Sequence, residues 1–397
     1  MGLGYIGLPT ATLIASKGIS VLGVDVSQRV VDTLRQGKAH ISEPDLEGLI
    51  RTVVDKKTLT VNTTPQAAGI FIIAVPTPFK KDKEPDLSYV ESAIDMIAPH
   101  LRPNDLLIIE STCPVGTTKK MKERILLARP ELDQSIFIAY CPERVLPGKI
   151  LYELEHNDRV IGGVTEEATE KAIQFYRQFV TGQLHGTTAR TAEMCKLIEN
   201  AYRDLNIGFA NELSMLCDKV DINPIELIDL ANLHPRVNIL QPGPGVGGHC
   251  IAVDPWFLIY EFPEETELMY KARRVNRYKT EWVIDKIQEA AAQFEKQHGR
   301  KAKIACLGLA YKPDIDDLRE SPAMEISMML QHRGEDVVAV EPNIQEAKVK
   351  DISIVALNQV LESADLLVPL VSHNQFKGID WKSLRGEVLD FCAVTSV

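Results

Sequence analysis

Residues 1–10 of the chain, MGLGYIGLPT, decide the fold, because Gly2, Gly4 and Gly7 form a G-x-G-x-x-G pattern. In dinucleotide-binding domains this pattern joins a buried strand to a helix, and its glycines let the backbone approach a pyrophosphate closely. The run that follows, ATLIASKG, has helical character and a stop signal at Gly18. We therefore predict that the chain starts with a Rossmann-like nucleotide-binding domain.

The next apolar run, ISVLGVD, predicts a strand that ends at Asp25. An acid at this distance beyond the third glycine is typical of domains in which a carboxylate binds the adenosine ribose. Such a carboxylate accepts hydrogen bonds from the ribose hydroxyls and repels a 2′-phosphate. The pattern thus favours NAD over NADP as the cofactor.

The strand that should precede the glycine turn is missing from the printed sequence, in which only Met1 stands before Gly2. In a doubly wound sheet that strand is central, so its loss leaves unpaired backbone on two neighbouring strands. We therefore expect the natural protein to begin several residues upstream, and the printed chain to fold poorly or to lose cofactor. A thermal melt and an NAD titration beside a chain extended by an apolar strand would test this.

Three further apolar runs, GIFIIAVPTP, NDLLIIESTCPVG and SIFIAYCPER, predict strands of the same parallel sheet. Ligand-binding groups gather at the carboxyl ends of such strands. This places Thr77, Ser111, Thr112 and Glu143 among the candidate site residues. For the serine and the threonines, capping of a helix N-terminus is an equally good alternative.

From residue 300 onward the chain repeats this organisation, with RKAKIACLGLAYKP, PAMEISMMLQHRG, EDVVAVEP and ADLLVPLVSH. The turn of this second α/β unit is GLAYKP, and Lys312 and Arg319 lie where glycines would approach a pyrophosphate. Cationic side chains there suit a phosphorylated ligand. The alternative is that both residues pair with the acids around them, which are Asp314, Asp316, Asp317 and Glu320.

Between the halves, residues 191–220 (TAEMCKLIENAYRDLNIGFANELSMLCDKV) carry apolar side chains at helical spacing, interrupted only by Gly208. We predict one long helix that links the two α/β units and serves as a homodimer interface. Lys196, Asn200 and Arg203 share one face of this helix. A lysine on a helix is usually a solvated surface residue, but this grouping beside the apolar stripe favours a cleft.

Residues 234–257, HPRVNILQPGPGVGGHCIAVDPWF, are the most unusual stretch, because glycines and prolines crowd ahead of Cys250. Gly247 and Gly248 allow close approach of the backbone to a ligand and can adopt positive φ. Backbone N–H groups and a nearby lysine would lower the pKa of the thiol. We therefore interpret Cys250 as a reactive nucleophile.

The other cysteines have no such surroundings, and we expect Cys195, Cys217 and Cys306 to be inert core residues. A metal site built from His249, Cys250 and Asp254 is disfavoured, because no second cluster has suitable spacing.

A cysteine nucleophile beside a nicotinamide has a chemical logic, because oxidation of a primary alcohol to an acid removes two hydrides. A thiolate captures the intermediate aldehyde as a thiohemiacetal, the second hydride leaves to give a thioester, and water releases the acid. The cycle needs a cationic or amide site for the oxyanion and a carboxylate for the water.

The overall composition limits the class of protein. A chain of 397 residues predicts two or three domains, and 45% hydrophobic with 25% charged residues is typical of a globular protein. A net charge of −11 argues against nucleic acid or an anionic membrane as a partner. Seven scattered cysteines without a C-x-x-C indicate a reducing cytoplasm.

The sequence as a whole resembles the UDP-sugar 6-dehydrogenases, the UDP-glucose/GDP-mannose dehydrogenase family. The resemblance covers essentially the whole chain and rests on GLGYIG, AVPTP, ESTCPVG, CPERVLPG, NDRVIGG, AEMCKLIENAYRDLNI, GVGGHCIAVDP and GLAYKPDIDDLRESPA. The Cys250 stretch is most similar to bacterial members that oxidise UDP-N-acetyl-D-mannosamine for enterobacterial common antigen and related surface polysaccharides.

The resemblance implies a role for each matching residue. Cys250 matches the nucleophile, Lys196 and Asn200 the oxyanion site, and Asp254, Glu143 and Thr112 the groups that organise water and thioester hydrolysis. The implied NAD contacts are Gly2, Gly4, Tyr5, Ile6, Gly7, Asp25, Arg29, Thr77, Thr112 and Arg319. The implied UDP-sugar contacts are Glu143, Arg144, Val145, Lys196, Asn200, Arg203, His234, Arg236, Gly247, Tyr311 and Lys312.

The resemblance also implies the fold, which is α/β with two Rossmann-like domains joined by a central helical domain. We expect the NAD-binding domain at 1–185, the helical dimerisation domain at 186–295 and the UDP-sugar-binding domain at 296–397. Three alternatives stay open: UDP-N-acetylglucosamine or UDP-glucose as the substrate, an inactive sugar-nucleotide-binding protein, and a one-hydride β-hydroxyacid dehydrogenase that needs no cysteine.

Overall fold

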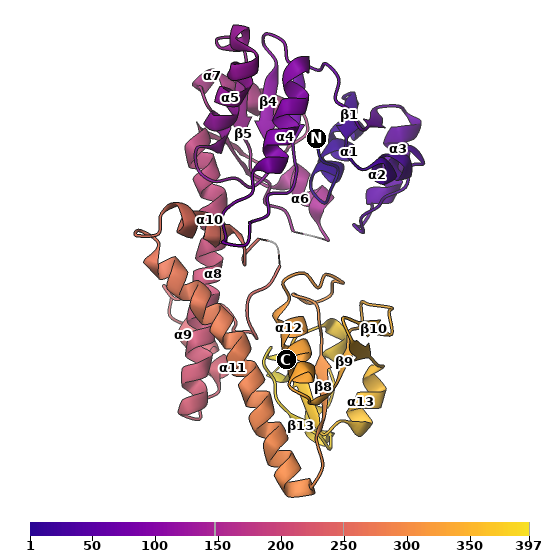
Figure 1. Ribbon diagram of the computed structural model, residues 1–397, viewed down its shortest axis with the longest axis vertical. Helices are drawn as coiled ribbons and strands as arrows, with labels where there is room; N and C mark the ends of the chain where they lie inside the picture. The colour runs from indigo at the N-terminus through magenta and orange to yellow at the C-terminus, as the bar shows by residue number, and fades with distance from the viewer. Residues whose placement is uncertain (147, 249, 397) are drawn as a thin grey trace. The chain divides into compact units, whose positions relative to one another are not determined.

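The computed structural model describes residues 1–146, 148–248 and 250–396, which form two compact units (Figure 1). Unit 1 comprises Met1–Glu199 and Trp256–Glu261, and unit 2 comprises Asn200–Pro255 and Phe262–Val397. The border between them falls inside two continuous helices, α8 (Ala189–Lys219) and α10 (Asp254–Glu261). The predicted α/β fold class is confirmed in both units.

Unit 1 alternates strands and helices after the glycine turn, except at two places. Its strands are β1 (Val21–Val24), β2 (Leu59–Asn62), β3 (Ile70–Ile73), β4 (Leu106–Ile109), β5 (Phe137–Tyr140), β6 (Arg159–Gly163) and β7 (Leu184–Thr188). Its helices before α8 are α1 (Gly7–Ser16), α2 (Gln28–Arg35), α3 (Leu46–Asp55), α4 (Ser88–Ile97), α5 (Thr117–Ala128), α6 (Ile150–His156) and α7 (Glu166–Tyr176). The exceptions are that α2 is followed directly by α3 and β2 by β3.

The strands of unit 1 form two separate sheets, β1-β2 and β3-β4-β5-β6-β7, in which all pairs are parallel except β5–β6. Residues 1 and 2 lie between the two sheets. The Gly2 amide donates to the Val24 carbonyl at the end of β1 (2.8 Å), and the Ala74 amide after β3 donates to the Met1 carbonyl (2.9 Å). The turn thus occupies the position that it has in a doubly wound sheet, and the proposed additional strand stays a prediction.

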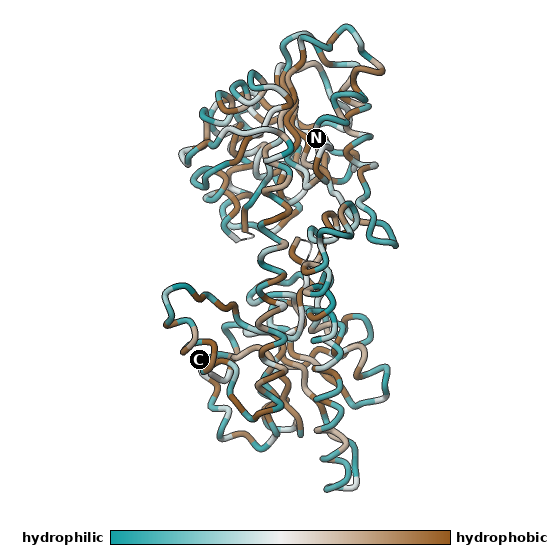
Figure 2. The backbone as a smooth tube through the Cα atoms, turned by 90° about the vertical axis from the view of Figure 1, so that its left-hand side faces the viewer, coloured by the Kyte–Doolittle hydropathy of each residue, from teal (hydrophilic) through white to brown (hydrophobic). Residues whose placement is uncertain are grey.

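The core of unit 1 lies against the long sheet, because its central strands are apolar on both faces. All four residues of β4 and all four of β5 are buried, as parallel strands covered by helices require. Figure 2 shows hydrophobic stretches of backbone gathered in the interior of the part that carries the N-terminus. The candidate site residues Thr77, Thr112 and Glu143 follow the ends of strands in this sheet.

Unit 2 combines the second half of α8 and a second long helix with a second α/β sheet. Its helices after α8 are α9 (Pro224–Asn232), the start of α10, α11 (Glu267–His298), α12 (Pro322–His332) and α13 (Leu357–Ser363). Its strands are β8 (Lys303–Leu307), β9 (Asp336–Val340), β10 (Lys348–Val349), β11 (Ile352–Ile354), β12 (Leu366–Pro369) and β13 (Glu387–Val388), in the order β10-β11-β9-β8-β12-β13.

The two α/β sheets share a local design, which confirms the internal repeat. Gly2 and Gly308 both have positive φ, at 84° and 92°, and the Gly308 amide donates to the Val340 carbonyl (2.8 Å) as the Gly2 amide does to Val24. At the next residue, the Leu309 amide donates to the Glu341 carboxylate (2.7 Å). In the first sheet the Leu3 amide donates to the Asp25 carboxylate in the same way. The acid that follows β1 or β9 therefore holds the glycine turn in each sheet.

The predicted long helix is α8, and one expectation about it is wrong. Gly208 does not interrupt it, and α8 runs unbroken through this position. A Cβ at Gly208 would lie 3.2 Å from the Cβ of Ala272 on α11. The small residue therefore marks a close crossing of two helices rather than a break in one.

Candidate active site

The glycine turn has the geometry of a phosphate-binding turn. A Cβ on Gly7 would lie 1.8 Å from the Gly2 carbonyl oxygen, whereas a Cβ on Gly4 would meet nothing within 4 Å. Gly7 thus allows α1 to pack against the turn, and exposed Gly4 leaves an open face. No side chain caps the amino end of α1 among the described residues, so its N–H groups can bind an anion.

Asp25 lies at the end of β1 beside this turn. Its carboxylate accepts hydrogen bonds from the Leu3 amide (2.9 Å) and the Ser27 amide (2.9 Å), which fix its orientation. Arg29 is exposed on α2 and Thr77 is half-buried after β3. The open glycine, the helix end and the fixed carboxylate match the diphosphate and ribose of NAD, and exposed Tyr5 and half-buried Ile6 border the turn.

Glu143 lies beyond the end of β5 and is held by two donors. The Arg144 amide donates to one carboxylate oxygen (2.7 Å), and the Arg159 guanidinium donates to the other (3.2 Å). Glu143 and Arg159 are both buried, so their charges compensate each other in a region with little water. The neighbouring Val145 is half-buried, and the Arg144 guanidinium donates to Glu199 of α8 (2.7 Å).

At the end of β4, Ser111 and Thr112 differ in their surroundings. Buried Ser111 donates to the Val75 carbonyl (2.8 Å) and accepts from the Val75 amide (2.9 Å), so it fixes the chain after β3. These bonds are not the helix capping that the sequence left open, and a role of Ser111 in ligand binding stays a prediction. Thr112 is half-buried at the same end of the sheet.

A buried group next to Glu143 escaped the sequence analysis. Glu110 accepts a hydrogen bond from the Tyr176 hydroxyl (2.7 Å), and the Arg159 guanidinium lies 5.0 Å from the centre of the Tyr176 ring. Burial raises the pKa of Glu110 to about 7, although the positive charge of Arg159 opposes the shift. The only sign of Glu110 in the sequence is its position directly after the apolar run of β4. Its partner Tyr176 lies far along the chain and is brought close only by the fold.

Three predicted residues of α8 are exposed to different degrees. Asn200 is buried, Lys196 is half-buried and Arg203 is exposed, although all three share one helix face. The Asn200 amide donates to the Asp254 carboxylate (2.5 Å). Two residues that the sequence separates by a long stretch are thus joined directly within unit 2.

Cys250 lies just before α10, in the turn that leads to Asp254. Its carbonyl accepts from the Val253 amide (3.0 Å) and from the Asp254 amide (2.8 Å). The residue is exposed, as a thiol that attacks a substrate must be. Cys217 and Cys306 are buried as expected, whereas Cys195 is half-buried, and His249 lies outside the described residues.

The loop before Cys250 lies against the turn of the second α/β sheet. The Gly248 amide donates to the Arg319 carbonyl (3.3 Å). A Cβ on Gly248 would lie 2.7 Å from the Tyr311 ring, and one on Gly247 would lie 2.4 Å from the Glu320 carbonyl oxygen. Both glycines are therefore required for this contact, which places the loop before Cys250 against Tyr311, one of the candidate UDP-sugar residues.

The cationic residues of that turn behave differently. The Arg319 guanidinium pairs with Asp317 (2.6 Å), so the alternative of pairing with neighbouring acids is confirmed for Arg319. Half-buried Lys312 has no ion pair within 4.0 Å among residues 1–146, 148–248 and 250–396. Lys312 can therefore serve an anionic ligand.

The turn that begins at Gly308 is fixed by two buried residues, Glu341 and His373, which the sequence analysis did not identify. His373 Nε2 lies 3.2 Å from the Glu341 carboxylate, which also accepts from the Leu309 and Ala310 amides (2.7 and 3.0 Å). Burial alone would raise the pKa of Glu341, but the bonds from His373 and these amides lower it. The carboxylate thus binds the amide that corresponds to Leu3 in the first turn and, in addition, the amide of the following residue.

His234 and Arg236 lie in the exposed segment after α9. Asn232 fixes this segment, because its side chain donates to the Ile239 carbonyl (3.0 Å) and accepts from the Ile239 amide (2.7 Å). Neither predicted residue is brought to Cys250 by a described contact. Their assignment stays a prediction.

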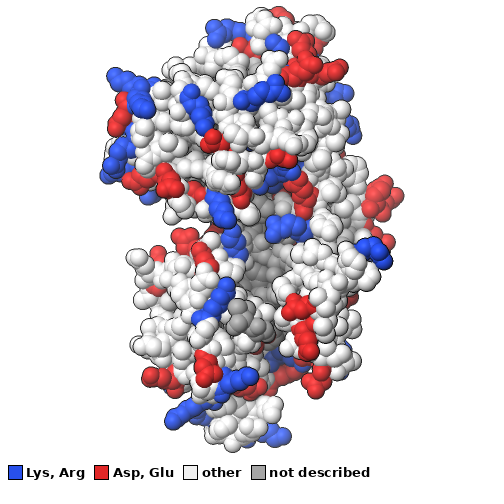
Figure 3. Space-filling model, turned by 180° about the vertical axis from the view of Figure 1, so that it is seen from behind, with Lys and Arg blue, Asp and Glu red and all other residues white. Residues whose placement is uncertain are grey.

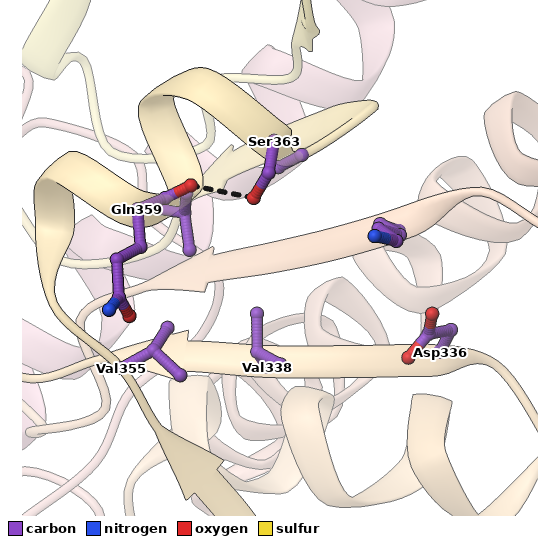
Figure 4. Close-up of a pocket in the computed structure, with 8 residues that line it drawn as sticks. Asp336, Val338, Val355, Gln359 and Ser363 are labelled. Atoms are coloured by element: carbon purple, nitrogen blue, oxygen red, sulfur yellow. Dashed lines mark hydrogen bonds between the residues drawn. The ribbon is translucent and has the colours of Figure 1, made fainter.

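A cavity of about 350 Å³ in unit 2 lies away from these residues, between β8, β9 and α13. Figure 4 shows Val338 and Val355 facing the α13 residues Gln359 and Ser363, with Asp336 at the start of β9. Ligands of parallel sheets bind at the carboxyl ends of the strands. We therefore do not assign the active site to this cavity.

Other kinds of site find little support in the described part of the chain. There, no group of three His, Cys, Asp or Glu side chains could hold a metal ion, and none of the helices has the length and apolar character to cross a membrane. Basic and acidic side chains are interspersed on the face in Figure 3.

Comparison with known proteins places this fold and site in one family. Models of the UDP-glucose/GDP-mannose dehydrogenase family match residues 1–180 as the NAD binding domain, 190–278 as the central domain and 305–394 as the UDP binding domain. The chain belongs to this family. It is an NAD-dependent oxidoreductase of sugar nucleotides, as the resemblance implied.

Individual relatives are similar over nearly the whole chain. The chain is 52% identical to UDP-N-acetyl-D-mannosamine dehydrogenase of Escherichia coli K12, over 96% of this chain and 94% of that protein. It is 50% identical to NDP-N-acetyl-D-galactosaminuronic acid dehydrogenase of Ralstonia nicotianae, over 98% of this chain and 93% of that protein. The solved structure of UDP-D-ManNAc dehydrogenase from Pyrococcus horikoshii matches this chain with a TM-score of 0.89 and 38% sequence identity. The match covers 99% of this chain and 94% of that chain.

Proposed function

We propose that the chain oxidises C6 of UDP-N-acetyl-D-mannosamine to the carboxylate of UDP-N-acetyl-D-mannosaminuronate. The observation that carries this proposal is that exposed Cys250 follows a loop bonded to the turn of Tyr311 and Arg319. The 52% identity to the Escherichia coli enzyme supports the choice of sugar. We further propose that the product supplies surface polysaccharides similar to enterobacterial common antigen.

NAD⁺, when bound at the glycine turn, supplies the acceptor for the hydride in each of two oxidations. The chain binds it through Gly2, Gly4, Gly7, Asp25 and Thr77, with Tyr5, Ile6, Arg29, Thr112 and Arg319 as further contacts. The NAD-binding, helical and UDP-binding domains are proposed at 1–185, 186–295 and 296–397.

Cys250 carries the second oxidation. Its thiolate adds to the C6 carbonyl of the aldehyde, so that a carbon–sulfur bond forms and the carbonyl electron pair moves to oxygen. The Lys196 ammonium and the Asn200 amide stabilise this oxyanion. Loss of the second hydride leaves a thioester on Cys250, which retains the intermediate until water cleaves it.

Hydrolysis of the thioester requires an ordered water molecule. Water attacks the thioester carbonyl, its proton passes to Glu143, and the carbon–sulfur bond breaks to restore the Cys250 thiolate. Asp254 and Thr112 orient the water, and the Asn200 bond fixes Asp254 for this task. The hydrogen bond from buried Arg159 fixes the position of Glu143.

The remaining substrate contacts hold the nucleotide and the sugar. Lys312 and Tyr311 bind the UDP group, with Arg144, Val145, Arg203 and Gly247 nearer the sugar, and His234 and Arg236 act from the segment after α9. A homodimer through the exposed apolar residues Tyr202, Phe209 and Leu216 of α8 completes the proposal. We also propose a cytoplasmic location, with which seven scattered cysteines in the sequence are consistent.

The test is to incubate the chain with UDP-N-acetyl-D-mannosamine and NAD⁺, and to measure NADH and product mass. We expect two NADH per uronate, and loss of acid formation by several orders of magnitude in Cys250→Ser. Acid formation by Cys250→Ser at the normal rate would exclude the covalent route and favour the one-hydride alternative.

The sugar is tested separately with UDP-N-acetylglucosamine, UDP-glucose and UDP-N-acetylgalactosamine. The last represents the second candidate function, which the 50% identity to the Ralstonia protein favours. We expect the mannosamine compound to give the highest kcat/KM. A preference for any other sugar would move the assignment to that substrate, and no turnover of any of them would favour a protein that only binds.

A further inference from the structure

The loop that leads to Cys250 is anchored at its start by two buried residues of the long helices. The Gly243 amide donates to Asn211 Oδ1 of α8 (2.9 Å), and Thr280 Oγ1 of α11 donates to the Pro244 carbonyl (2.9 Å). Asn211 is fully buried and Thr280 is 5% exposed. Two polar side chains inside the helix pair are thus used to hold a loop.

Asn211 is itself fixed by a chain of polar groups between α8 and α11. Its amide nitrogen donates to Asn276 Oδ1 (2.8 Å), and the Asn276 amide nitrogen donates to the Asp204 carboxylate (2.8 Å). Arg273 pairs with the same carboxylate (2.5 Å). Because each member is buried and bonded, the amide of Asn211 has one orientation, with its oxygen toward Gly243.

The loop also fits closely around Thr280. Gly245 has a φ of +149°, and a Cβ there would lie 2.4 Å from Thr280 Oγ1. At the other end, the Gly248 amide is bonded to the Arg319 carbonyl. The segment 243–248 is therefore held at one end by the helices and at the other by the candidate UDP-sugar turn.

A nucleophile needs this kind of support. A segment rich in glycine has many conformations in isolation, and a misplacement of about 1 Å at a reacting atom can lower a rate about 100-fold. Asn211 and Thr280 touch neither Cys250 nor the candidate substrate residues in any described contact. Their hydrogen bonds remove freedom from the loop just before the thiol.

We infer that Asn211 and Thr280 are positioning residues, which hold the 243–248 loop so that the Cys250 thiolate meets the C6 aldehyde. The inference rests on the proposed function, because it assumes that Cys250 is the nucleophile. It assigns to two buried helix residues a role in the second oxidation. Their effect on the first oxidation is limited to substrate binding through Gly247, and a saturating concentration of the UDP-sugar removes it.

The experiment compares Asn211→Leu and Thr280→Val, which remove the anchoring groups at similar volume, with Ser214→Ala as the matched control. Ser214 is buried on α8 and bonded to Lys279 and to the Asn211 carbonyl, and none of its hydrogen bonds among the described residues reaches the loop. Thr280→Ser restores the hydroxyl and serves as the conservative variant.

Two measurements are made on each variant, namely single-turnover NADH formation and the rate of Cys250 alkylation by iodoacetamide, located by peptide mass. For Asn211→Leu and Thr280→Val we expect a 10- to 100-fold slower second oxidation, release of aldehyde and a changed alkylation rate. The first oxidation should change less than 3-fold, and Ser214→Ala and Thr280→Ser should behave as the wild type.

Normal second oxidation in both Asn211→Leu and Thr280→Val would overturn the inference. So would an equal loss in Ser214→Ala, because that would indicate general loosening of the helix pair. If Asn211→Leu does not fold, the contrast between Thr280→Val and Thr280→Ser decides the matter. Undiminished acid formation in Cys250→Ser would instead refute the proposed function, a result that these anchor variants cannot mimic.

Discussion

Single glycines set the geometry of the cofactor turn. Gly2 supplies the positive φ that the turn needs, and Gly7 leaves room for the Gly2 carbonyl oxygen. These are separate requirements, one of backbone conformation and one of space. Neither can be met by another residue without movement of α1 or of the chain after β3.

We predict that Gly7→Ala weakens both folding and NAD binding. The new Cβ would lie 1.8 Å from the Gly2 carbonyl oxygen, so α1 must shift, at a cost of about 2–4 kcal/mol. Thermal melts and an NAD titration measure the two effects. Gly48→Ala on α3, whose Cβ would meet nothing within 4 Å, is the control and should keep or raise the stability. Unchanged NAD affinity in Gly7→Ala would contradict this account.

The sequence allowed some residues to be predicted and concealed others. Gly2, Gly7 and Asp25 follow from local spacing, and Cys250 follows from the glycines before it. Glu110, Asn211 and the Glu341–His373 pair could not be found, because their roles depend on partners far along the chain and on burial. A buried polar residue shows no local pattern that distinguishes it from a surface one.

At the scale of elements, α8 and α11 combine an apolar contact with a row of buried polar groups. The periodicity of α8 predicted its length, but it could not show that Gly208 meets Ala272 of α11. Lys279 of α11 is 3% exposed, donates to Ser214 (2.9 Å) and lies 3.8 Å from the centre of the Trp282 ring. Burial lowers the pKa of this lysine to about 7.

This lysine makes the stability of the helix pair depend on pH. In the unfolded chain the pKa of Lys279 is 10.5, and in the folded chain it is about 7. Between these values the unfolded state binds more protons, so the free energy of unfolding rises as the pH rises from 7 toward 10.5. Below pH 7 that contribution is lost.

We therefore predict that Lys279→Met stabilises unit 2 at pH 7 by on the order of 2–3 kcal/mol and flattens the pH dependence. Urea unfolding followed by tryptophan fluorescence at pH 6.5 and pH 9.5 measures both effects. Lys296→Met, at an exposed position of α11, is the control and should retain the slope. A slope in Lys279→Met equal to that of the wild type would show that another group titrates.

At the scale of the whole molecule, α8 presents apolar side chains that the single chain does not cover. Tyr202, Phe209 and Leu216 follow one another at seven-residue intervals and are 63%, 53% and 57% exposed. Such spacing places them on one stripe. In the proposed homodimer, a second copy of the chain would cover these three side chains.

We predict that Phe209→Asp converts the proposed dimer into a monomer, because a charge in the middle of an apolar interface must lose its hydration. Sedimentation velocity and light scattering measure the mass. Leu127→Asp, on α5 of unit 1 and 88% exposed in the wild type, is the matched control and should leave the mass unchanged. A wild-type chain that sediments as a monomer, or a Phe209→Asp variant that stays dimeric, would refute the stripe as the interface.

The carboxylate of Glu341, seated on the backbone amides of the second glycine turn, has a consequence for inhibitor chemistry. Although the chain contains the nucleotide-binding architecture twice, this acid occupies the Leu309 and Ala310 amides of the later copy, so a diphosphate in that domain must be bound by side chains such as Lys312. An inhibitor shaped like the complete dinucleotide should thus find a single receptor in each chain. Compounds designed for the second α/β domain must instead bind the side chains around its turn, such as Tyr311 and Lys312.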